Sequence, residues 1–293
     1  MSESRYEITS VEGNRQRLDG GAMFGNAPKA LWSRWVPCDE QNRIDLACRA
    51  FLIVDRARDR RILLETGIGA FFAPKLRDRY GVRGEGHLLL ENLAALGVAP
   101  EEVDDIVLSH LHFDHAGGLL TPWVAGKAPS LVFPRARIIV GDVAWARAQT
   151  PHRRDHASFI PALVELLAAS GRLVTVEAGE AHPLGDDFSF SLSEGHTPGQ
   201  LLTELTTDEG SVAFAGDLIP GVVWMHPAIT MGYDRFPELL VEEKERFLSR
   251  AHRRDTRLLF THDAAVACAQ VAVDAKGRYI AGETWATLST LVL

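Results

Sequence analysis

The sequence has few cysteines, no long hydrophobic run and no excess of positive charge. Its three cysteines are an odd number at no metal-ligand spacing, so we expect no disulfide framework. No stretch approaches the roughly 20 apolar residues that a membrane-spanning helix needs. The first residues contain no apolar run typical of a secretion signal. These absences predict a cytoplasmic protein that does not bind a membrane.

Acidic residues outnumber basic ones, 39 to 31, which gives a net charge of −8 over 293 residues. Nucleic-acid-binding surfaces are usually basic, so this balance argues against a nucleic-acid partner. The composition, 46% hydrophobic and 24% charged, is typical of a globular protein. It does not select a substrate.

Short apolar runs alternate with longer amphipathic segments, and neither a repeat nor a low-complexity linker separates them. The pattern predicts strands at 50–54, 61–64, 106–108, 137–140, 173–176, 188–192, 201–206, 212–215 and 258–260. It predicts helices at 88–96, 159–169 and 238–252. Strands that alternate with helices indicate an α/β protein whose sheet strands are covered by helices, and we expect a single domain over residues 1–293.

A cluster of histidines follows the predicted strand at 106–108. His110, His112, Asp114 and His115 stand within six residues, and Gly117 begins a Gly-Gly turn directly after them. Imidazole and carboxylate groups are the ligands that zinc-type metals prefer. If the segment turns after the strand, the first two histidines face one metal, and Asp114 and His115 face a second. A polar loop with scattered histidines is the alternative, and this density of ligands argues against it.

Three more candidate ligands share one local context, because each follows an apolar strand. His196 follows the strand at 188–192, Asp217 follows 212–215, and His262 follows 258–260. Taken singly, such a residue is more often a turn former. Taken as a set, the three are predicted to complete the metal site, with Asp217 as the bridge because one carboxylate can hold two cations.

Several aromatic and histidine side chains leave more than one interpretation open. Phe24 and Trp32 wall a substrate pocket, pack on a partner subunit or fill a core. Trp224 and His226 follow Asp217 closely in the sequence, so we expect both side chains to lie near the site. Whether they also contact the substrate is left open by the sequence. Three further histidines have no visible partner and are predicted to lie on the surface: His87, His182 and His252.

The order and spacing of these seven ligands resemble the metallo-β-lactamase superfamily, over about 50–262. The resemblance implies an αββα four-layer sandwich and two divalent metal ions bridged by Asp217 and a hydroxide. Zinc is the first expectation, and the same ligands accept cobalt, manganese or iron. Three stretches resemble the quorum-quenching N-acyl-homoserine lactonases (YtnP-like) and methyl parathion hydrolase: 18–25, 194–199 and 216–220.

Three positions depart from the lactonase pattern. Pro220 stands where the best-known lactonases place a tyrosine, and Tyr233 is the candidate to replace it. Gln200 stands where many members have a second histidine, and Glu65 replaces the usual aspartate of an Asp-Thr-Gly motif. The glutamate is expected to change a contact behind the metal ligands.

The resemblance implies a hydrolase that opens a lactone ring of a small molecule by attack of the bridging hydroxide. Asp114 is the expected proton carrier, and Tyr233 is expected to stabilise the oxyanion. The segments 1–45 and 142–171 are expected to shape the substrate pocket, and a homodimer is implied. Two alternatives stay open: an organophosphate or other ester hydrolase with the same metals, and an inactive metal-binding module.

Overall fold

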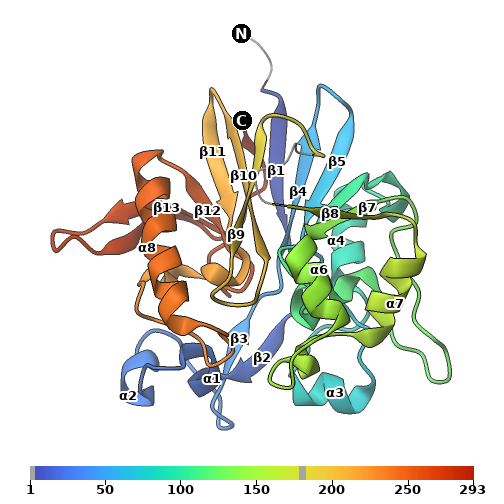
Figure 1. Ribbon diagram of the computed structural model, residues 1–293, viewed down its shortest axis with the longest axis horizontal. Helices are drawn as coiled ribbons and strands as arrows, with labels where there is room; N and C mark the ends of the chain where they lie inside the picture. Colours follow the sequence, from blue (N-terminus) through green and yellow to red (C-terminus); the bar gives the residue numbers. More distant parts are fainter. Residues whose placement is uncertain (1–3, 178–182) are drawn as a thin grey trace. The chain divides into compact units, whose positions relative to one another are not determined.

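The computed structural model describes residues 4–177 and 183–293, and its chain forms two compact units. Unit 1 consists of Met1–Gln16, Ala47–Glu177 and Leu288–Leu293, and unit 2 consists of Arg17–Leu46 and Ala178–Thr287. Each unit has its own sheet, helices and hydrophobic core (Figure 1). Within the described ranges, no helix has both the length and the apolar character to cross a membrane.

Unit 1 is built on a seven-stranded sheet with the order β15-β1-β4-β5-β6-β7-β8. Its strands are β1 (Tyr6–Val11), β4 (Ala50–Asp55), β5 (Arg60–Leu64), β6 (Asp105–Val107), β7 (Arg137–Gly141), β8 (Leu173–Val176) and β15 (Leu291–Val292). The strands from β5 to β8 pair in parallel, with Leu64 opposite Val107. Parallel strands end at the same edge of a sheet, so the segments after β5 and β6 leave it side by side.

The helices of unit 1 cover this sheet. They are α3 (Pro74–Arg79), α4 (Leu88–Ala95), α5 (Phe113–Ala116), α6 (Asp142–Gln149) and α7 (Pro161–Ala169), with 3₁₀ turns η1 (Pro100–Glu102), η2 (Gly117–Leu119) and η3 (His156–Ser158). α6 packs on β7, β8 and α7, and α4 packs on β1. The buried leucines of α4 and α7 join the core beneath the sheet.

Unit 2 contains a six-stranded sheet with the order β14-β13-β12-β11-β10-β9 and a small sheet of two strands. The strands are β9 (Phe188–Ser193), β10 (Gln200–Thr207), β11 (Gly210–Phe214), β12 (Arg257–Leu259), β13 (Cys268–Val273) and β14 (Tyr279–Trp285), with β2 (Gln16–Asp19) and β3 (Arg43–Leu46) in the small sheet. β11 and β12 are parallel, and β10 runs antiparallel to both β9 and β11. The carboxyl ends of β9, β11 and β12 therefore lie at one edge.

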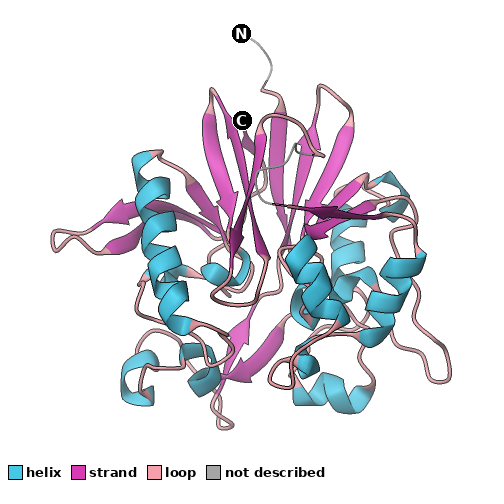
Figure 2. Cartoon of the chain, viewed as in Figure 1, coloured by secondary structure: helices cyan, strands magenta, loops and turns pink. Residues whose placement is uncertain are grey.

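Helix α8 (Pro237–Arg253), orange in Figure 1, lies against β13 in unit 2. Its apolar side chains join a core with β11 and β12, including Leu240 and Phe247. The other helical segments of this unit are short: α1 (Gly20–Phe24), α2 (Lys29–Trp32), η4 (Gly216–Leu218) and η5 (Val222–Met225). Figure 2 shows this contrast between one long helix and several single turns.

All nine predicted strands and all three predicted helices are present, with ends within two residues of those expected. The strands β1, β2, β3, β13, β14 and β15 were not predicted. β14 is mostly exposed along its length, so it carries no apolar run for a sequence pattern to detect. Of the two segments expected to shape a pocket, 142–171 forms α6, η3 and α7 in unit 1, and most of 1–45 belongs to unit 2.

Candidate functional site

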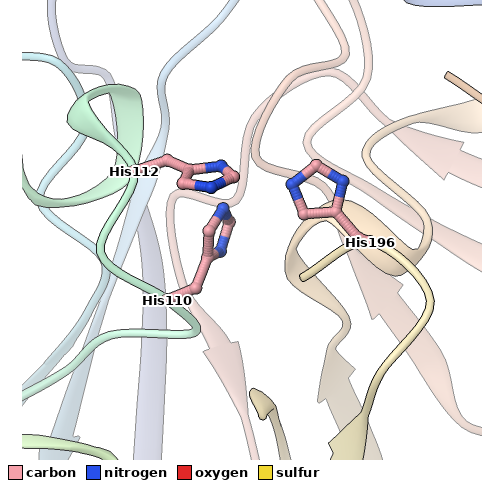
Figure 3. A group of neighbouring side chains, drawn as sticks. All are labelled: His110, His112 and His196. Carbon is pink, nitrogen blue, oxygen red and sulfur yellow. The ribbon is translucent and has the colours of Figure 1, made fainter. Parts of the chain in front are cut away.

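The first four predicted ligands lie on one short segment of unit 1, between the end of β6 and the first turn of α5. The imidazole rings of His110 and His112 have centroids 4.4 Å apart, and those of His110 and His115 lie 4.0 Å apart. Figure 3 shows His110 and His112 next to each other on this segment. All four side chains are buried.

The ligand atoms of this segment lie close together in pairs. They are within 4.8 Å for His110 with His112, for His110 with His115, and for Asp114 with His115. The Asp114 Oδ1 lies 3.8 Å from the His115 Nε2. The structure therefore brings the four residues together as the sequence predicted. A Cβ at Gly118 would lie 2.0 Å from the Thr66 carbonyl oxygen, so the turn that follows needs glycine.

Glu65 braces this segment from the end of β5. Its Oε1 accepts a hydrogen bond of 2.8 Å from the Ser109 backbone N–H, and its Oε2 lies 3.5 Å from the His115 Nδ1. The residue is fully buried with φ +67°, a left-handed conformation that costs energy outside glycine. Because β5 and β6 end together, Glu65 reaches the ligand segment. Its contacts there offset the strain of the left-handed backbone.

Two further residues hold the same segment. The Gln16 Nε2 donates a 2.6 Å hydrogen bond to the Asp114 Oδ2, and both side chains are buried. The Thr66 Oγ1 and backbone N–H both donate to the His115 carbonyl oxygen, at 2.9 and 3.0 Å. The orientation of Asp114 and the path of the backbone at His115 are thus fixed by residues far away in the sequence.

The other three predicted ligands meet at one edge of the unit 2 sheet. His196, Asp217 and His262 follow β9, β11 and β12, whose carboxyl ends lie together. The Asp217 Oδ2 lies 3.3 Å from the His196 Nε2, and its Oδ1 lies 3.3 Å from the His262 Nε2. Each carboxylate oxygen therefore faces a different imidazole, as a bridging role for Asp217 requires.

His196 is held from two directions. Its Nδ1 is 2.8 Å from the Asp234 Oδ1, and this contact leaves Nε2 facing Asp217. Glu243 on α8 accepts hydrogen bonds from the Ser193 Oγ and from the backbone N–H groups of Glu194 and Gly195, at 2.6, 2.9 and 3.1 Å. Helix α8 thus fixes the turn that presents His196.

Gln200 and Pro220, two of the residues that depart from the lactonase pattern, make hydrogen bonds to the segments that carry Asp217 and His262. The Gln200 Nε2 donates to the Ala215 carbonyl oxygen at 3.2 Å, just before Asp217. The Pro220 carbonyl oxygen accepts hydrogen bonds from the backbone N–H groups of His262 and Asp263, at 3.0 and 3.1 Å. Pro220 therefore links the two ligand-bearing segments through its backbone.

The donor types of these residues fit a divalent metal ion. Zinc holds nitrogen and carboxylate oxygen ligands at about 2.0 to 2.2 Å, so two ligands at a tetrahedral angle lie about 3.3 to 3.5 Å apart. The two Asp217–histidine separations of 3.3 Å match this spacing. The buried imidazoles and carboxylate of unit 1 are ligands of the same types. The chain thus carries buried His and Asp side chains able to bind metal.

The predicted substrate aromatics form a packed cluster in unit 2. Phe24 stacks on Trp224 at 4.9 Å and on Trp32 at 5.5 Å. All three are at most 3% exposed, and the Trp224 Nε1 donates to the Met23 carbonyl oxygen at 3.0 Å. They belong to a hydrophobic core with Ile44 and other residues. These three aromatic side chains therefore pack as part of a core, which is one of the interpretations that the sequence left open. Their contact with a substrate stays a prediction.

Tyr233 and His226 lie on the chain between η5 and α8, and both are exposed. Tyr233 directly precedes Asp234, the residue that contacts His196. The roles of Tyr233 in holding an oxyanion and of His226 in contacting substrate stay predictions. His252 is exposed, as predicted, and its Nδ1 lies 3.1 Å from the Val271 carbonyl oxygen. His182 lies outside the described residues.

The prediction that His87 is a surface residue is wrong. Its side chain is buried, and its Nε2 lies 3.0 Å from the carbonyl oxygen of Gly118, in the turn after the ligand segment. Burial lowers the pKa of His87. Its place at the start of α4 brings it to this turn, and a lone histidine carries no sequence signal for such a contact.

Unit 1 also contains an aromatic cavity of about 440 Å³ that the sequence analysis missed. Its lining includes Phe72, Tyr80, Phe113, Phe159 and Ile160. Phe113 stands inside the ligand segment, and the Phe159 ring packs edge-on against His112 with centroids 5.0 Å apart. The sequence signal was the aromatic pair Phe71-Phe72 together with Phe113. The lining also includes residues of α3 and the first residue of α7, which lie far apart in the sequence.

Several solved structures have a similar fold. A probable metal-dependent hydrolase from Staphylococcus aureus shares 26% identity, covers 97% of this chain and all of its own, and has a TM-score of 0.84. AidC, a dizinc quorum-quenching lactonase, shares 22% identity over 97% of this chain and 96% of its own, with a TM-score of 0.73. The hydrolase AbOPH shares 21% identity over the same proportions, with a TM-score of 0.74.

A ribonuclease from Thermus thermophilus is 30% identical over 128 residues, which are 43% of this chain. The match spans only 28% of that ribonuclease. The model of the Metallo-beta-lactamase superfamily matches residues 43–262, a range that contains all seven predicted ligands. Together with the similar solved structures, this match confirms the predicted α/β fold class. The chain belongs to the metallo-β-lactamase superfamily of hydrolases.

Proposed function

We propose that this hydrolase opens the lactone ring of a small molecule with an apolar acyl chain, such as an N-acyl-homoserine lactone. The proposal takes the four candidate ligands of unit 1 and the three of unit 2 as one set for two divalent ions. The family match and the His/Asp groups of both units support it. Zinc is the metal we expect, since it suits imidazole and carboxylate ligands.

Two divalent ions held by these residues would supply an electrophile for the lactone carbonyl and would lower the pKa of a bound water towards about 7. The residues of the chain would orient the substrate and transfer protons during this reaction. Asp114, which accepts a hydrogen bond from Gln16, is the group to which we assign the proton transfer to the leaving alkoxide. Tyr233, an exposed residue, carries the hydroxyl that we assign to the developing oxyanion.

The aromatic cavity of unit 1 is the observation that carries the choice of substrate. Its volume of about 440 Å³ lies in the range of small-molecule sites. It adjoins the ligand segment, because Phe113 belongs to that segment and Phe159 packs on His112. An acyl chain in this cavity would place its lactone end towards the metal ligands. AidC, which shares the fold, is described in complex with a product N-hexanoyl-L-homoserine.

A substrate panel tests this proposal. The purified protein, loaded with zinc, is assayed on N-acyl-homoserine lactones with four to twelve acyl carbons, on an aryl phosphotriester and on single-stranded RNA. We expect lactone opening with kcat/KM rising with chain length, and little hydrolysis of the other two. Phosphotriester or RNA hydrolysis without lactone opening would overturn the proposal. The RNA arm also tests the expectation that no nucleic acid binds.

Aryl phosphotriester hydrolysis is the second candidate, and Pro220 is the observation that favours it. Pro220 stands where a lactone-binding tyrosine is expected, and its contacts to His262 and Asp263 are backbone contacts that any residue can make. An aryl group also suits an aromatic cavity. The Tyr233→Phe variant separates the candidates: lactone turnover should fall several-fold while phosphotriester turnover stays unchanged. Metal analysis that finds fewer than two ions per chain, with no ester hydrolysis, would indicate an inactive module.

A further inference from the structure

Helix α8 carries a lysine in an unusual position. Lys244 is 1% exposed, although lysine is among the residues least often buried. Its Nζ donates a 2.6 Å hydrogen bond to the Ile229 carbonyl oxygen. Burial of this ammonium is costly, and it lowers the Lys244 pKa to about 8. A residue chosen for packing alone would be apolar at this position.

The charge of Asp234 raises the Lys244 pKa and so counteracts part of the effect of burial. Asp234 is itself 2% exposed. Its Oδ2 accepts a 2.6 Å hydrogen bond from the Met231 backbone N–H, and its Oδ1 lies 2.8 Å from the His196 Nδ1. Asp234 therefore links the chain at Met231 to a candidate metal ligand, entirely within unit 2.

The lysine also fixes the segment on which Asp234 stands. Ile229, which accepts the lysine hydrogen bond, lies five residues before Asp234. The next residues of the chain, Arg235 and Phe236, donate backbone hydrogen bonds to the Gly195 carbonyl oxygen at 3.0 and 2.8 Å. This segment and the turn of His196 are thus joined directly, and Lys244 holds one end of it.

We propose that Lys244 is a positioning residue. By donating to the Ile229 carbonyl oxygen it fixes the segment of Asp234, which contacts the His196 Nδ1 and leaves Nε2 presented for a metal ion. The proposal rests on the proposed function in one respect, that His196 is a metal ligand. A partner at Nδ1 fixes the orientation of a metal-binding imidazole, so the orientation of His196 is set before any metal binds.

Metal affinity tests the proposal independently of activity. Lys244→Met keeps the unbranched length and removes the charge, and Lys276→Met, at an exposed lysine of the same unit, is the matched control. Zinc affinity is measured by competition with a chromophoric chelator, with circular dichroism to verify folding. Because outer contacts of metal ligands contribute 10- to 100-fold in affinity, we expect Lys244→Met to bind the weaker-held zinc about 10- to 100-fold less tightly. Lys276→Met should match the unmodified protein.

The outcomes separate this inference from the proposed function. If His196→Ala leaves zinc affinity unchanged, His196 is no ligand and the proposed metal set is wrong. If His196→Ala weakens zinc binding while folded Lys244→Met binds zinc normally, the role of Lys244 is overturned.

A second variant tests the same link if Lys244→Met fails to fold. Asp234→Asn keeps the shape of the side chain, but an amide offers one acceptor oxygen where the carboxylate uses two, one at the Met231 N–H and one at the His196 Nδ1. We expect it to weaken zinc binding about 10- to 100-fold in the same chelator competition. Normal zinc affinity in folded Asp234→Asn would overturn the route through this segment.

Discussion

The two groups of candidate ligands are built in different ways. In unit 1, four ligands stand on six consecutive residues, and their relative positions follow from one turn and the start of α5. In unit 2, three ligands stand on three separate segments spread over 67 positions of the sequence, from His196 to His262. They meet because β9, β11 and β12 end at one sheet edge.

The difference determines what each group needs for support. The contiguous group requires a few contacts that orient rings already near each other, such as those from Glu65 and Gln16. The dispersed group needs its segments joined, and Glu243, Asp234 and Pro220 make these links. A long sequence separation makes every such link dependent on the tertiary fold. The predictions below test whether both groups serve one function and whether their supports differ.

The largest effect is expected from removing one ligand of either group. His110→Ala in unit 1 and His262→Ala in unit 2 should each reduce kcat/KM about a thousandfold, because metal ions stabilise the transition state by several kcal/mol. Metal content and kcat/KM are measured for both variants, with His252→Ala as the control at an exposed histidine. If one variant keeps near-normal activity, the two groups do not serve a single centre.

A second effect concerns the two glutamate braces. Glu65→Gln and Glu243→Gln are each expected to weaken zinc binding about 10- to 100-fold. The loss should be greater for Glu243→Gln, because that carboxylate accepts three hydrogen bonds and an amide offers one acceptor oxygen. Chelator competition measures both affinities. Glu242→Gln, at the exposed neighbour on α8, should bind zinc normally, and a greater loss for Glu65→Gln would reverse the comparison.

The aromatic cavity gives unit 1 a feature that should separate substrates by chain length. Phe72→Ala removes one wall, and the lost apolar contact of about 1 to 3 kcal/mol should reduce kcat/KM for a decanoyl lactone about tenfold or more. A butanoyl lactone should be affected less than threefold. Phe236→Ala, at a half-exposed phenylalanine of unit 2, is the matched control. Equal losses for both chain lengths would place the acyl chain elsewhere.

Each unit contains a buried basic side chain that should make the free energy of unfolding depend on pH. In unit 2, burial lowers the pKa of Lys244 from the usual 10.5 to about 8, so the unfolded chain binds more protons between these values. The free energy of unfolding should therefore rise with pH, by about 1 kcal/mol from pH 8 to 9 relative to Lys244→Met. Cys268, whose pKa burial raises to about 12, acts oppositely above pH 9. Urea unfolding of metal-free protein at pH 8 and 9 measures the slope, and parallel curves would contradict it.

The counterpart in unit 1 is His87, whose pKa is lowered from 6.5 by burial. Its contribution to stability is complete above pH 6.5 and is lost as the pH falls towards the lowered value. The unfolding free energy of the unmodified protein should thus approach that of His87→Gln between pH 7 and 5, by less than about 1 kcal/mol. The same urea unfolding measures it. An unchanged difference across this range would show that His87 has the same pKa in the folded and unfolded states.

Sequence patterns predicted most of the sheets and the ligand set, because these depend on short-range regularities. Apolar runs gave the position of β4 to β12, and the spacing from His110 to His115 indicated a metal site. The residues that hold the ligands were not predicted. Gln16, Asp234 and Glu243 are ordinary polar residues in the sequence, and only packing shows which side chains they contact.

The aromatic residues also show what the sequence could not predict, because their positions in the sequence did not indicate which of them line a pocket. Phe24, Trp32 and Trp224 stand near candidate motifs in the sequence, yet they stack on each other as a core. Phe72, Tyr80 and Phe159 stand far from each other in sequence or outside the motifs, and they line the cavity. An aromatic side chain is apolar in either place, so the sequence alone does not distinguish a filled core from an open pocket.

The sequence by itself determined the family, the α/β class and the chemistry of the ligands, because apolar periodicity and ligand spacing are local properties of the chain. Only the tertiary structure decided how the candidate ligands are oriented, that unit 1 has an aromatic cavity, and that Lys244 holds the segment of Asp234, which contacts His196. These features depend on contacts between residues tens of positions apart. Such contacts are fixed by strand register and helix packing, which become defined when the chain folds.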